Sequence, residues 1–287
     1  MRKIKFSKFT GQGNDFIIMD STIQHLKFSS EEISKICNRN FGIGADGLII
    51  VEKSEKADYM MKYYNKDGTI AEMCGNGIRC MAEFIYENNI SKKILLNIET
   101  LSGIKEVLIK KKETSLNSIK VNMGLPEFNP EKIPVNIEGR KINEIFNYKA
   151  KINSNIFNIN CVSMGNPHCV VLIDENMDLN NVPLNKWGPA LENFHIFPKK
   201  TNVEFIRIVS NKELSMRVWE RGVGETLACG TGACAAVVCA IKLGKIKSDN
   251  TRVNLPGGKL NITWKNKKSS VFLEGTVNYI FNGEYFI

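Results

Sequence analysis

The stretch Cys74-Gly75-Asn76-Gly77 has a close copy 155 residues later, Cys229-Gly230-Thr231-Gly232. Each stretch opens a mainly apolar run, and the run after the second one, 233–241, holds only small or apolar side chains. Such runs predict a buried helix that begins just after each cysteine. The first amide groups of a helix lack partners within it and lie at the positive end of its dipole. We therefore expect both thiols to lie beside amide groups that lower the thiol pKa and can bind a carboxylate.

A Gly-Asn pair precedes each cysteine at a similar distance. Asn14 lies 60 residues before Cys74, and Asn166 lies 63 residues before Cys229. The matched spacing indicates a duplicated unit in which strands surround one central helix. Two such halves facing each other would bring both helix N-termini to a shared cleft, where two thiols flank one anion.

Strand-like alternation is more frequent than helical periodicity along the chain. Strands are expected at 4–9, 16–20, 48–52, 59–63, 156–162, 169–174, 202–209 and 214–218. Three further strand-like runs follow the first Cys-Gly helix up to about Asn122, and more strands are expected around Pro256-Gly257-Gly258. A capping box of Ser29 and Glu32 predicts a short helix through Cys37, and another helix is expected near 183–193.

This pattern predicts an α+β fold instead of a doubly wound sheet. We expect two pseudo-symmetric halves, each a mostly antiparallel sheet wrapped around a central helix, with the active site in the cleft between them. Three prolines in 123–151 indicate a crossing point between the halves. The halves are therefore placed at 1–122 and 123–275.

The composition is that of a globular protein that can bury a sizeable core. Of the 287 residues, 43% are hydrophobic and 24% are charged, and no apolar run reaches the length of a membrane span. Residues 1–6 are basic and lead into strand-like sequence, not into the apolar region of a secretory signal. We expect a cytoplasmic protein with no membrane partner.

The net charge of +9 comes mostly from scattered lysines. The basic residues are not interleaved with aromatic ones, as they are on nucleic-acid platforms, so no nucleic-acid partner is expected. The excess charge would at most attract an anionic substrate.

Motifs for a metal or a cofactor are missing from the sequence. The eight cysteines include no CxxC pair of the kind that binds zinc, and disulfides are not expected in a cytoplasmic chain of this size. Cys37, Cys80, Cys234 and Cys239 fall on apolar faces and are interpreted as buried small hydrophobes. Gly11–Phe16 lacks the third glycine of a dinucleotide-binding loop. We predict no metal ion and no cofactor.

Two thiols and an anion site suit proton transfer at a carbon that bears an amine and a carboxylate. Without pyridoxal phosphate, the developing charge must be stabilised on the carboxylate itself, and helix N-terminal amides aimed at its oxygens do this. Inversion then needs one base on each face of the carbon. One thiol must be ionised and the other protonated.

A series of longer motifs extends over almost the whole chain. In order they are Gly13-Asn14-Asp15-Phe16, Asn65-x-Asp67-Gly68, Glu72–Cys80, Met164–His168, Thr201–Glu204, Glu220–Thr226, Cys229–Ala233 and Leu255–Gly258. Their combination closely resembles the diaminopimelate epimerase family. The resemblance implies interconversion of L,L- and meso-diaminopimelate without pyridoxal phosphate, in the synthesis of lysine and of peptidoglycan precursors. It also implies a homodimer and a C-terminal strand, 276–287, that returns to the first half.

The resemblance further implies roles for individual residues. Cys74 and Cys229 would be the acid/base thiols, with His168 and Glu220 tuning them. Contacts to this small amino dicarboxylate substrate are implied for Asn14, Asn65, Gly75, Asn76, Asn166, Asn202, Glu220, Arg221, Gly230 and Thr231. One position departs from the family pattern, because some members carry a substrate-binding Gln where this chain has Gly47. That contact is expected to be absent here or replaced by water or backbone.

Several of these residues have a simpler interpretation. Asn14 and Asn166 would also suit left-handed turns, and Asn65, just before Lys66-Asp67-Gly68, would suit an ordinary turn. His168 would also suit a packing role beside Pro167.

Three other functions stay open at this point. The nearest is a proline or hydroxyproline racemase of the same architecture, for which contacts to a distal ammonium and carboxylate would be superfluous. Another is a thiol redox protein in which Cys74 and Cys229 cycle through a disulfide. The third is a binding module without catalysis.

Overall fold

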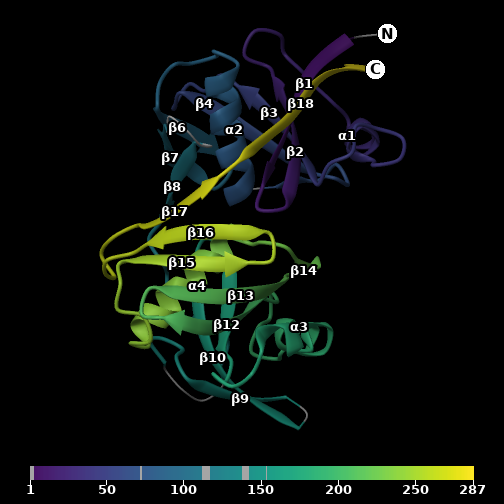
Figure 1. The fold of residues 1–287 in the computed structure, drawn as a ribbon. Helices are drawn as coiled ribbons and strands as arrows, with labels where there is room; N and C mark the ends of the chain where they lie inside the picture. Colours follow the sequence, from purple (N-terminus) through teal and green to yellow (C-terminus); the bar gives the residue numbers. More distant parts are fainter. Residues whose placement is uncertain (1–2, 72, 112–116, 138–141, 153) are drawn as a thin grey trace. The chain divides into compact units, whose positions relative to one another are not determined.

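The computed structural model describes residues 3–71, 73–111, 117–137, 142–152 and 154–287 (Figure 1). The chain divides into two compact units. The first unit combines Met1–Asn122 with Glu274–Ile287, and the second is Met123–Leu273.

The first unit is built around helix α2. Its elements in chain order are β1 (Lys3–Gly11), β2 (Asn14–Asp20), α1 (Ser30–Cys37), β3 (Gly47–Glu52), β4 (Tyr59–Asn65), β5 (Ile70–Ala71), α2 (Gly75–Glu87), β6 (Leu95–Thr100), β7 (Gly103–Lys110), β8 (Ser118–Gly124) and β18 (Asn278–Phe286). Every residue of α2 from Gly75 to Ile85 is buried, and the helix packs against β1, β2, β3, β4 and β7. The sheet therefore wraps around α2.

The second unit is built in the same way around helix α4. Its elements are β9 (Tyr148–Ile152), β10 (Asn155–Ser163), β11 (Pro167–Leu172), η1 (Leu179–Asn181), α3 (Leu184–Glu192), β12 (Asn202–Ser210), β13 (Glu213–Glu220), β14 (Gly224–Thr226), α4 (Gly230–Lys242), β15 (Asn250–Leu255), β16 (Gly258–Thr263) and β17 (Val271–Thr276). Helix α4 is apolar all round and packs against β10, β11, β12, β13, β15 and β16. A helix with no polar face is stable only when it is surrounded, and here strands surround it.

The strand pairings repeat from one unit to the other. In the first unit β1–β2 is antiparallel, β2–β3 parallel, β3–β4 antiparallel, β4–β6 parallel and β6–β7 antiparallel. The strands β10, β11, β12, β13, β15 and β16 pair in the same sequence and with the same directions. The predicted duplication into two similar α+β halves is therefore confirmed.

Each unit also adds one strand beside its first hairpin. Strand β18 pairs antiparallel with β1, which brings the described ends of the chain together, with Lys3 opposite Phe286 (Figure 1). Strand β9 pairs antiparallel with β10 in the second unit. Strand β9 is missing from the strands expected from the sequence, although Tyr148, Ala150 and Ile152 alternate with lysines and pack on the core of the unit.

The predicted capping box at α1 is confirmed. The Ser29 side chain accepts a hydrogen bond from the Glu32 N–H at 3.2 Å, and the Glu32 carboxylate accepts one from the Ser29 N–H at 2.7 Å. The predicted burial of Cys37, Cys80 and the two cysteines within α4 is confirmed as well. In the part of the chain that the structure describes, no helix is long and apolar enough to span a membrane.

Candidate active site

Both predicted thiols lie at the start of their helices, with nearly the same geometry. Cys74 is the N-cap of α2 with φ −136° and ψ 117°, and Cys229 is the N-cap of α4 with φ −121° and ψ 116°. The Cys74 Sγ accepts a hydrogen bond from the Gly77 N–H at 3.4 Å, and the Cys229 Sγ accepts one from the Gly232 N–H at 3.4 Å. A thiol thus takes the place of the usual Ser, Thr, Asp or Asn cap.

The first helical residues after each cap are Gly75 and Asn76 in one unit and Gly230 and Thr231 in the other. Their N–H groups belong to the helix turn that has no intrahelical acceptor. An N–H group and the helix dipole both favour an anion at this position. Each unit therefore presents a thiol next to main-chain donors that can hold one carboxylate.

The surroundings of Cys229 correct one expectation from the sequence. Burial, followed by the nearby carboxylates of Glu220 and Glu204, raises the pKa of the Cys229 thiol well above its ordinary value. Hydrogen bonds from Thr231 and from the Gly232 N–H act in the opposite direction but are outweighed. The prediction that the helix N-terminus lowers this pKa is therefore wrong for Cys229, because desolvation and like charge exceed the dipole.

Glu220 lies next to this thiol. Its carboxylate accepts hydrogen bonds from the Thr226 hydroxyl and from Cys229. Burial raises the pKa of Glu220, and Glu204 adds to the increase, while both hydrogen bonds lower it. The contact with Cys229 is consistent with the implied role in tuning the thiol.

A second buried carboxylate, Glu204, has no role in the sequence-based site. Its Oε1 lies 2.7 Å from His168 Nδ1, and both side chains have no exposed surface. His168 Nε2 lies 2.9 Å from Asn166 Oδ1. An acidic residue within the apolar strand sequence Asn202-Val203-Glu204-Phe205-Ile206 was the signal that could have identified Glu204.

Asn202 connects two segments of the second unit. Its Oδ1 accepts the Arg221 N–H at 2.9 Å, and its Nδ2 donates to the Pro167 carbonyl at 2.9 Å. The Arg221 guanidinium is exposed and donates to the Lys199 carbonyl at 3.4 Å. The structure therefore brings Asn202 and Arg221 together through the main chain and leaves the guanidinium largely in solvent.

In the first unit, two of the predicted asparagines contact each other. Asn76 Nδ2 donates to Asn14 Oδ1 at 2.7 Å, and Asn14 Nδ2 donates to Asp46 Oδ2 at 3.3 Å. Arg79 Nη2 donates to Asn76 Oδ1 at 2.8 Å, and Arg79 Nη1 donates to the Gly75 carbonyl at 2.8 Å. The buried arginine thus fixes the first turn of α2, on which Asn76 lies.

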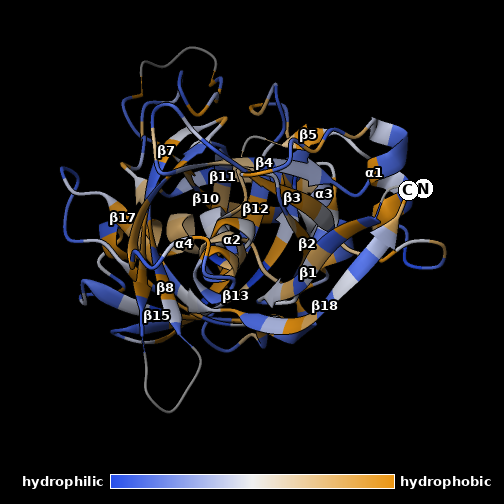
Figure 2. Ribbon diagram, turned by 90° about the horizontal axis from the view of Figure 1, so that it is seen from above, coloured by the Kyte–Doolittle hydropathy of each residue, from blue (hydrophilic) through white to orange (hydrophobic). Residues whose placement is uncertain are grey.

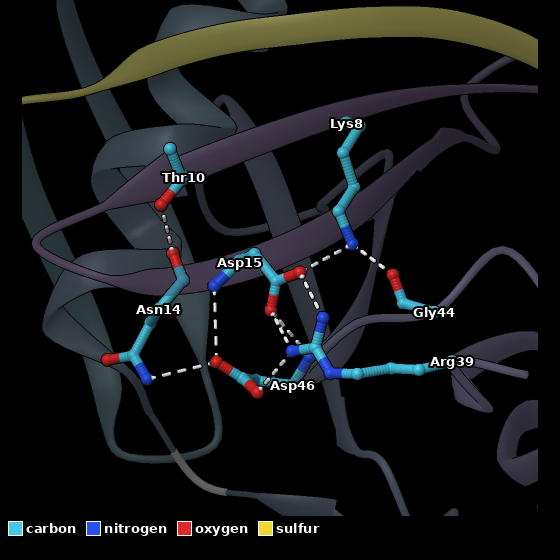
Figure 3. Close-up of polar contacts among 7 residues, drawn as sticks. All are labelled: Lys8, Thr10, Asn14, Asp15, Arg39, Gly44 and Asp46. Carbon is cyan, nitrogen blue, oxygen red and sulfur yellow. Dashed lines mark hydrogen bonds and ion pairs between the residues drawn. The ribbon is translucent and has the colours of Figure 1, made fainter. Parts of the chain in front are cut away.

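A compact ionic network supports Asn14 (Figure 3). Asp15 forms ion pairs with Lys8 and with Arg39 at 2.7 Å each, and Arg39 reaches Asp46 at 2.9 Å. Burial by itself raises the pKa of Asp15, but hydrogen bonds from Arg39 and Lys8 outweigh it, so the pKa lies well below the ordinary value. The carboxylate therefore stays ionised at neutral pH.

We expect Asp15→Asn to destabilise the protein by about 3–5 kcal/mol, because it leaves the nearly buried Lys8 ammonium without its counter-charge. Arg39→Gln should cost at most about 1 kcal/mol, since that side chain is largely exposed. Denaturant unfolding measures both.

The folded-state pKa of Asp15 is lowered, so its stabilising effect is complete above the unfolded-state pKa of about 4 and declines as the pH falls further. The stability of Asp15→Asn should therefore fall less steeply below about pH 4 than that of the wild type. Equal acid sensitivity of the two proteins would contradict this assignment.

Asn14 and Asn166 do not adopt the left-handed conformation, whereas Asn65 does make a turn contact. The left-handed positions in these turns are Gln12, Gly13 and Gly165, not Asn14 or Asn166, so the left-handed-turn alternative is wrong for both. Asn65 donates from its side chain to the Thr69 hydroxyl at 3.0 Å, which is a turn contact.

The departure at Gly47 has a steric reason. A β-carbon at Gly47 would lie 2.5 Å from Tyr63 Cε2 and 2.6 Å from the Tyr64 carbonyl oxygen. The Tyr63 ring, packed edge-on against Phe16 at 5.9 Å, fills the space that a side chain at position 47 would need.

Gly47→Gln should therefore destabilise the first unit by about 1–3 kcal/mol, the usual cost of overpacking. Adding Tyr63→Ala should restore part of that loss, since it removes the ring contact and leaves the main-chain contact. Thermal unfolding of the single and double variants measures both effects, and a Gly47→Gln protein as stable as the wild type would refute the steric explanation.

The structure brings some of the predicted residues together and leaves others apart. In the first unit Asn14 contacts Asn76 in the first turn of α2, whereas Asn65 contacts Thr69 in its own turn. In the second unit Asn166 contacts His168, Glu220 contacts Cys229, and Asn202 contacts the main chain of Arg221. Within the described ranges, no cluster of three or more His, Cys, Asp or Glu side chains is arranged to hold a metal ion.

Comparison with known proteins identifies relatives over nearly the full length. The family model described as diaminopimelate epimerase matches residues 6–129 and 160–280. A diaminopimelate epimerase of Halothermothrix orenii is 48% identical over 288 residues, covering 99% of both chains. Another, of Acetivibrio thermocellus, is 41% identical and covers 98% of both.

Solved structures of low sequence identity share the fold. A phenazine biosynthesis protein of the PhzF family from Bacillus anthracis superposes with a TM-score of 0.69 at 18% identity, covering 100% of both chains. A hydroxyproline epimerase from Agrobacterium vitis, with bound trans-4-hydroxy-L-proline, has a TM-score of 0.66 at 10% identity and covers 99% of this chain and 92% of that one. These similarities confirm the predicted fold of two similar halves and, at this identity, nothing more.

Proposed function

Because the chain belongs to the diaminopimelate epimerase family, we propose that it interconverts L,L- and meso-diaminopimelate, with Cys74 and Cys229 as the two bases. The observation that carries the mechanism is the pair of cysteine N-caps with matching geometry on α2 and α4. The reaction is an isomerisation that needs no external oxidant or reductant.

The proposed reaction moves one proton off the α-carbon and another onto it. The thiolate of one cysteine removes the α-proton from one face, and the electrons of the C–H bond pass into the carboxylate. Main-chain N–H groups of Gly75, Asn76, Gly230 and Thr231 hold the carboxylate oxygens, where preorganised donors stabilise the developing charge. The thiol of the other cysteine then donates a proton to the opposite face. The carbon is inverted, and the two cysteines have exchanged protonation states.

The resting states of the two thiols follow from their surroundings. Burial and two carboxylates keep Cys229 protonated, and its hydrogen bond to Glu220 is a donor contact. We therefore assign Cys229 as the proton donor in the resting enzyme and Cys74 as the base. One inversion therefore leaves Cys74 protonated and Cys229 ionised. The enzyme returns to its resting state when the two cysteines exchange their protonation states again.

Recognition of the distal end of the substrate is assigned to the polar side chains around the thiols. A bidentate guanidinium suits a carboxylate and an amide suits either end of an amino acid, so Arg221 and the asparagines 14, 65, 166 and 202 are the proposed contacts. Glu220 is proposed to face an ammonium group as well as Cys229. The exposed Arg221 guanidinium is consistent with a group that awaits its ligand.

The test is incubation with L,L-diaminopimelate in deuterated water at neutral pH. We expect deuterium at one α-carbon of each inverted molecule and no turnover of proline or hydroxyproline. Turnover of proline but not of diaminopimelate would support the racemase alternative. Loss of activity on addition of a thiol reductant would support the redox alternative, because a two-base mechanism needs reduced cysteines.

We also propose that the protein is a cytoplasmic homodimer. Strand β18 carries large apolar side chains that are about half exposed, Tyr279, Ile280, Phe281 and Phe286, and Figure 2 shows hydrophobic and hydrophilic segments alternating along it. Exposed apolar patches of this kind commonly form interfaces. Light scattering of the wild type and of Ile280→Lys tests the dimer, which the lysine should dissociate.

A further inference from the structure

The duplicated fold provides an internal comparison between the two thiol sites. Phe16 on β2 is opposite Gly47 on β3, and His168 on β11 is opposite Asn202 on β12, in the same parallel register. Gly47 on β3 and Asn202 on β12 are therefore equivalent positions. Two residues further along each strand lie Ile49 and Glu204, which makes Glu204 the counterpart of Ile49. His168 is likewise the counterpart of Phe16, and the cysteine caps match.

In the first unit these positions are filled by an apolar pair. Phe16 is 1% exposed and Ile49 is 0% exposed. Ile49 packs directly against the helix, since its Cδ1 lies 3.0 Å from the place of a β-carbon at Gly77. Two hydrocarbon side chains are therefore sufficient to fill these positions and to pack against the central helix.

In the second unit the same positions hold an ionisable pair, His168 and Glu204. Glu204 Oε1 occupies the place of the Ile49 methyl, 2.7 Å from the position of a β-carbon at Gly232, and Cys229 Sγ lies 3.3 Å from that same point. The other carboxylate oxygen, Oε2, is buried and has no hydrogen-bond partner among the residues that the structure describes.

Burying this pair is costly compared with the apolar alternative found in the first unit. Removing two ionisable groups from water carries a desolvation penalty, and an incompletely hydrogen-bonded carboxylate recovers only part of it. Packing does not account for the pair, because Phe16 and Ile49 achieve packing without that cost. The two sites therefore differ in the ionisable groups placed beside the cysteine, and this difference points to a role in the chemistry of Cys229.

We propose that Glu204 is a positioning residue of the Cys229 site, which fixes the His168 ring and maintains the negative surroundings that keep Cys229 as the proton donor. The proposal rests on the proposed function and adds to it a residue that acts through its neighbours. Glu204 does not have to touch the substrate to do so.

The first part of this role is orientation. With Nδ1 held by Glu204, the ring of His168 presents Nε2 to Asn166 Oδ1 at 2.9 Å. A carboxylate that holds one ring nitrogen selects the orientation and protonation of the other, as in hydrolase triads. Without Glu204, the ring loses the contact that holds Nδ1 in this position.

The second part is electrostatic. Glu204 contributes to the raised pKa of Cys229, together with Glu220 and after burial. The ionisable groups that face Glu204 are His168 and Cys169 from β11, Glu220 from β13, and Cys229 and Cys239 from α4. Within this set only His168 can carry a positive charge, so removal of the Glu204 charge leaves Cys229 easier to ionise.

The test compares Glu204→Gln with the wild type in epimerisation of L,L-diaminopimelate across a pH range. We expect kcat to fall roughly 10- to 100-fold, as for other residues that orient a functional histidine, with KM changed less than about 2-fold. The limb of the pH profile at which Cys229 loses its proton should move to lower pH, since a like charge has been removed. An unchanged profile would overturn the proposal.

A double-mutant cycle separates action through His168 from a structural effect. His168→Phe with Glu204→Ile reproduces the apolar pair of the first unit, so the double variant should fold and unfold at no lower temperature than the wild type. At a pH below the limb assigned to Cys229, its activity should equal that of His168→Phe alone, because there the loss of the Glu204 charge does not change the protonation of Cys229 and Glu204 has no ring left to orient. Losses that multiply in the double variant would overturn the proposal.

Glu213 provides a matched control, because it begins strand β13, at the opposite end of that strand from Glu220. Glu213 accepts a hydrogen bond from the Asn254 amide at 2.8 Å, so Glu213→Gln makes the same chemical change outside the site. It should leave kcat and the pH profile unchanged. If the wild type itself does not turn over diaminopimelate, the proposed function fails, whereas an active wild type with an indifferent Glu204→Gln variant refutes only the inference about Glu204.

Discussion

Replacing either N-cap cysteine by alanine should abolish inversion of diaminopimelate. Each thiol supplies one of the two proton transfers in the proposed mechanism, and general acid–base groups typically contribute 10²- to 10⁴-fold to a rate. We therefore expect Cys74→Ala and Cys229→Ala to lose roughly 10³-fold or more of kcat, with substrate still bound by the remaining contacts. Measuring L,L-to-meso conversion by chiral chromatography tests this.

Cys37→Ala provides the matched control for these variants. Cys37 is a buried thiol in α1, and burial raises its pKa to about 11, so it remains protonated at neutral pH. Its replacement should cost stability but leave turnover almost intact. Residual inversion near the wild-type rate in either N-cap variant would remove the two-base assignment.

The second large effect is expected at Gly232. A β-carbon there would lie 2.7 Å from Glu204 Oε1 and 3.3 Å from Cys229 Sγ, so Gly232→Ala must displace the carboxylate, the thiol or the start of α4. Misplacing a reacting group by about 1 Å can cost about 10²-fold in rate, and we expect a loss of kcat of that order. Steady-state kinetics combined with a thermal melt distinguishes displacement from unfolding.

Gly77→Ala in the other unit is the appropriate comparison. The new β-carbon would meet the ends of two flexible side chains, Ile49 Cδ1 at 3.0 Å and Met61 Cε at 3.2 Å. These atoms can move by a few tenths of an ångström, so the loss of activity should be clearly smaller than for Gly232→Ala. Equal losses would show that the helix position, not the Glu204 contact, controls the effect.

Much of the architecture was predictable because it depends on local pattern. The repeated Cys-Gly-x-Gly motifs placed both helix starts, and the alternation in strands such as 214–218 reflects one buried and one exposed face. Strand β9 does alternate, with Tyr148, Ala150 and Ile152 separated by lysines, but three apolar positions are a short signal. Strands β5 and β14 are shorter still, with two and three residues, and each pairs with the strand just before it in the chain.

The family, the fold class and the positions of the two N-cap thiols were determined by the sequence alone, since they depend on motifs and spacing along the chain. The protonation of Cys229, the partnership of His168 with Glu204 and the exclusion of a side chain at Gly47 were decided only by the tertiary structure. Each of these depends on groups that are distant in sequence but adjacent in space, and desolvation and steric contact act through space. A dipole argument made from sequence therefore predicted the wrong direction for the Cys229 pKa, because it could not include two carboxylates that the sheet brings to the same helix end.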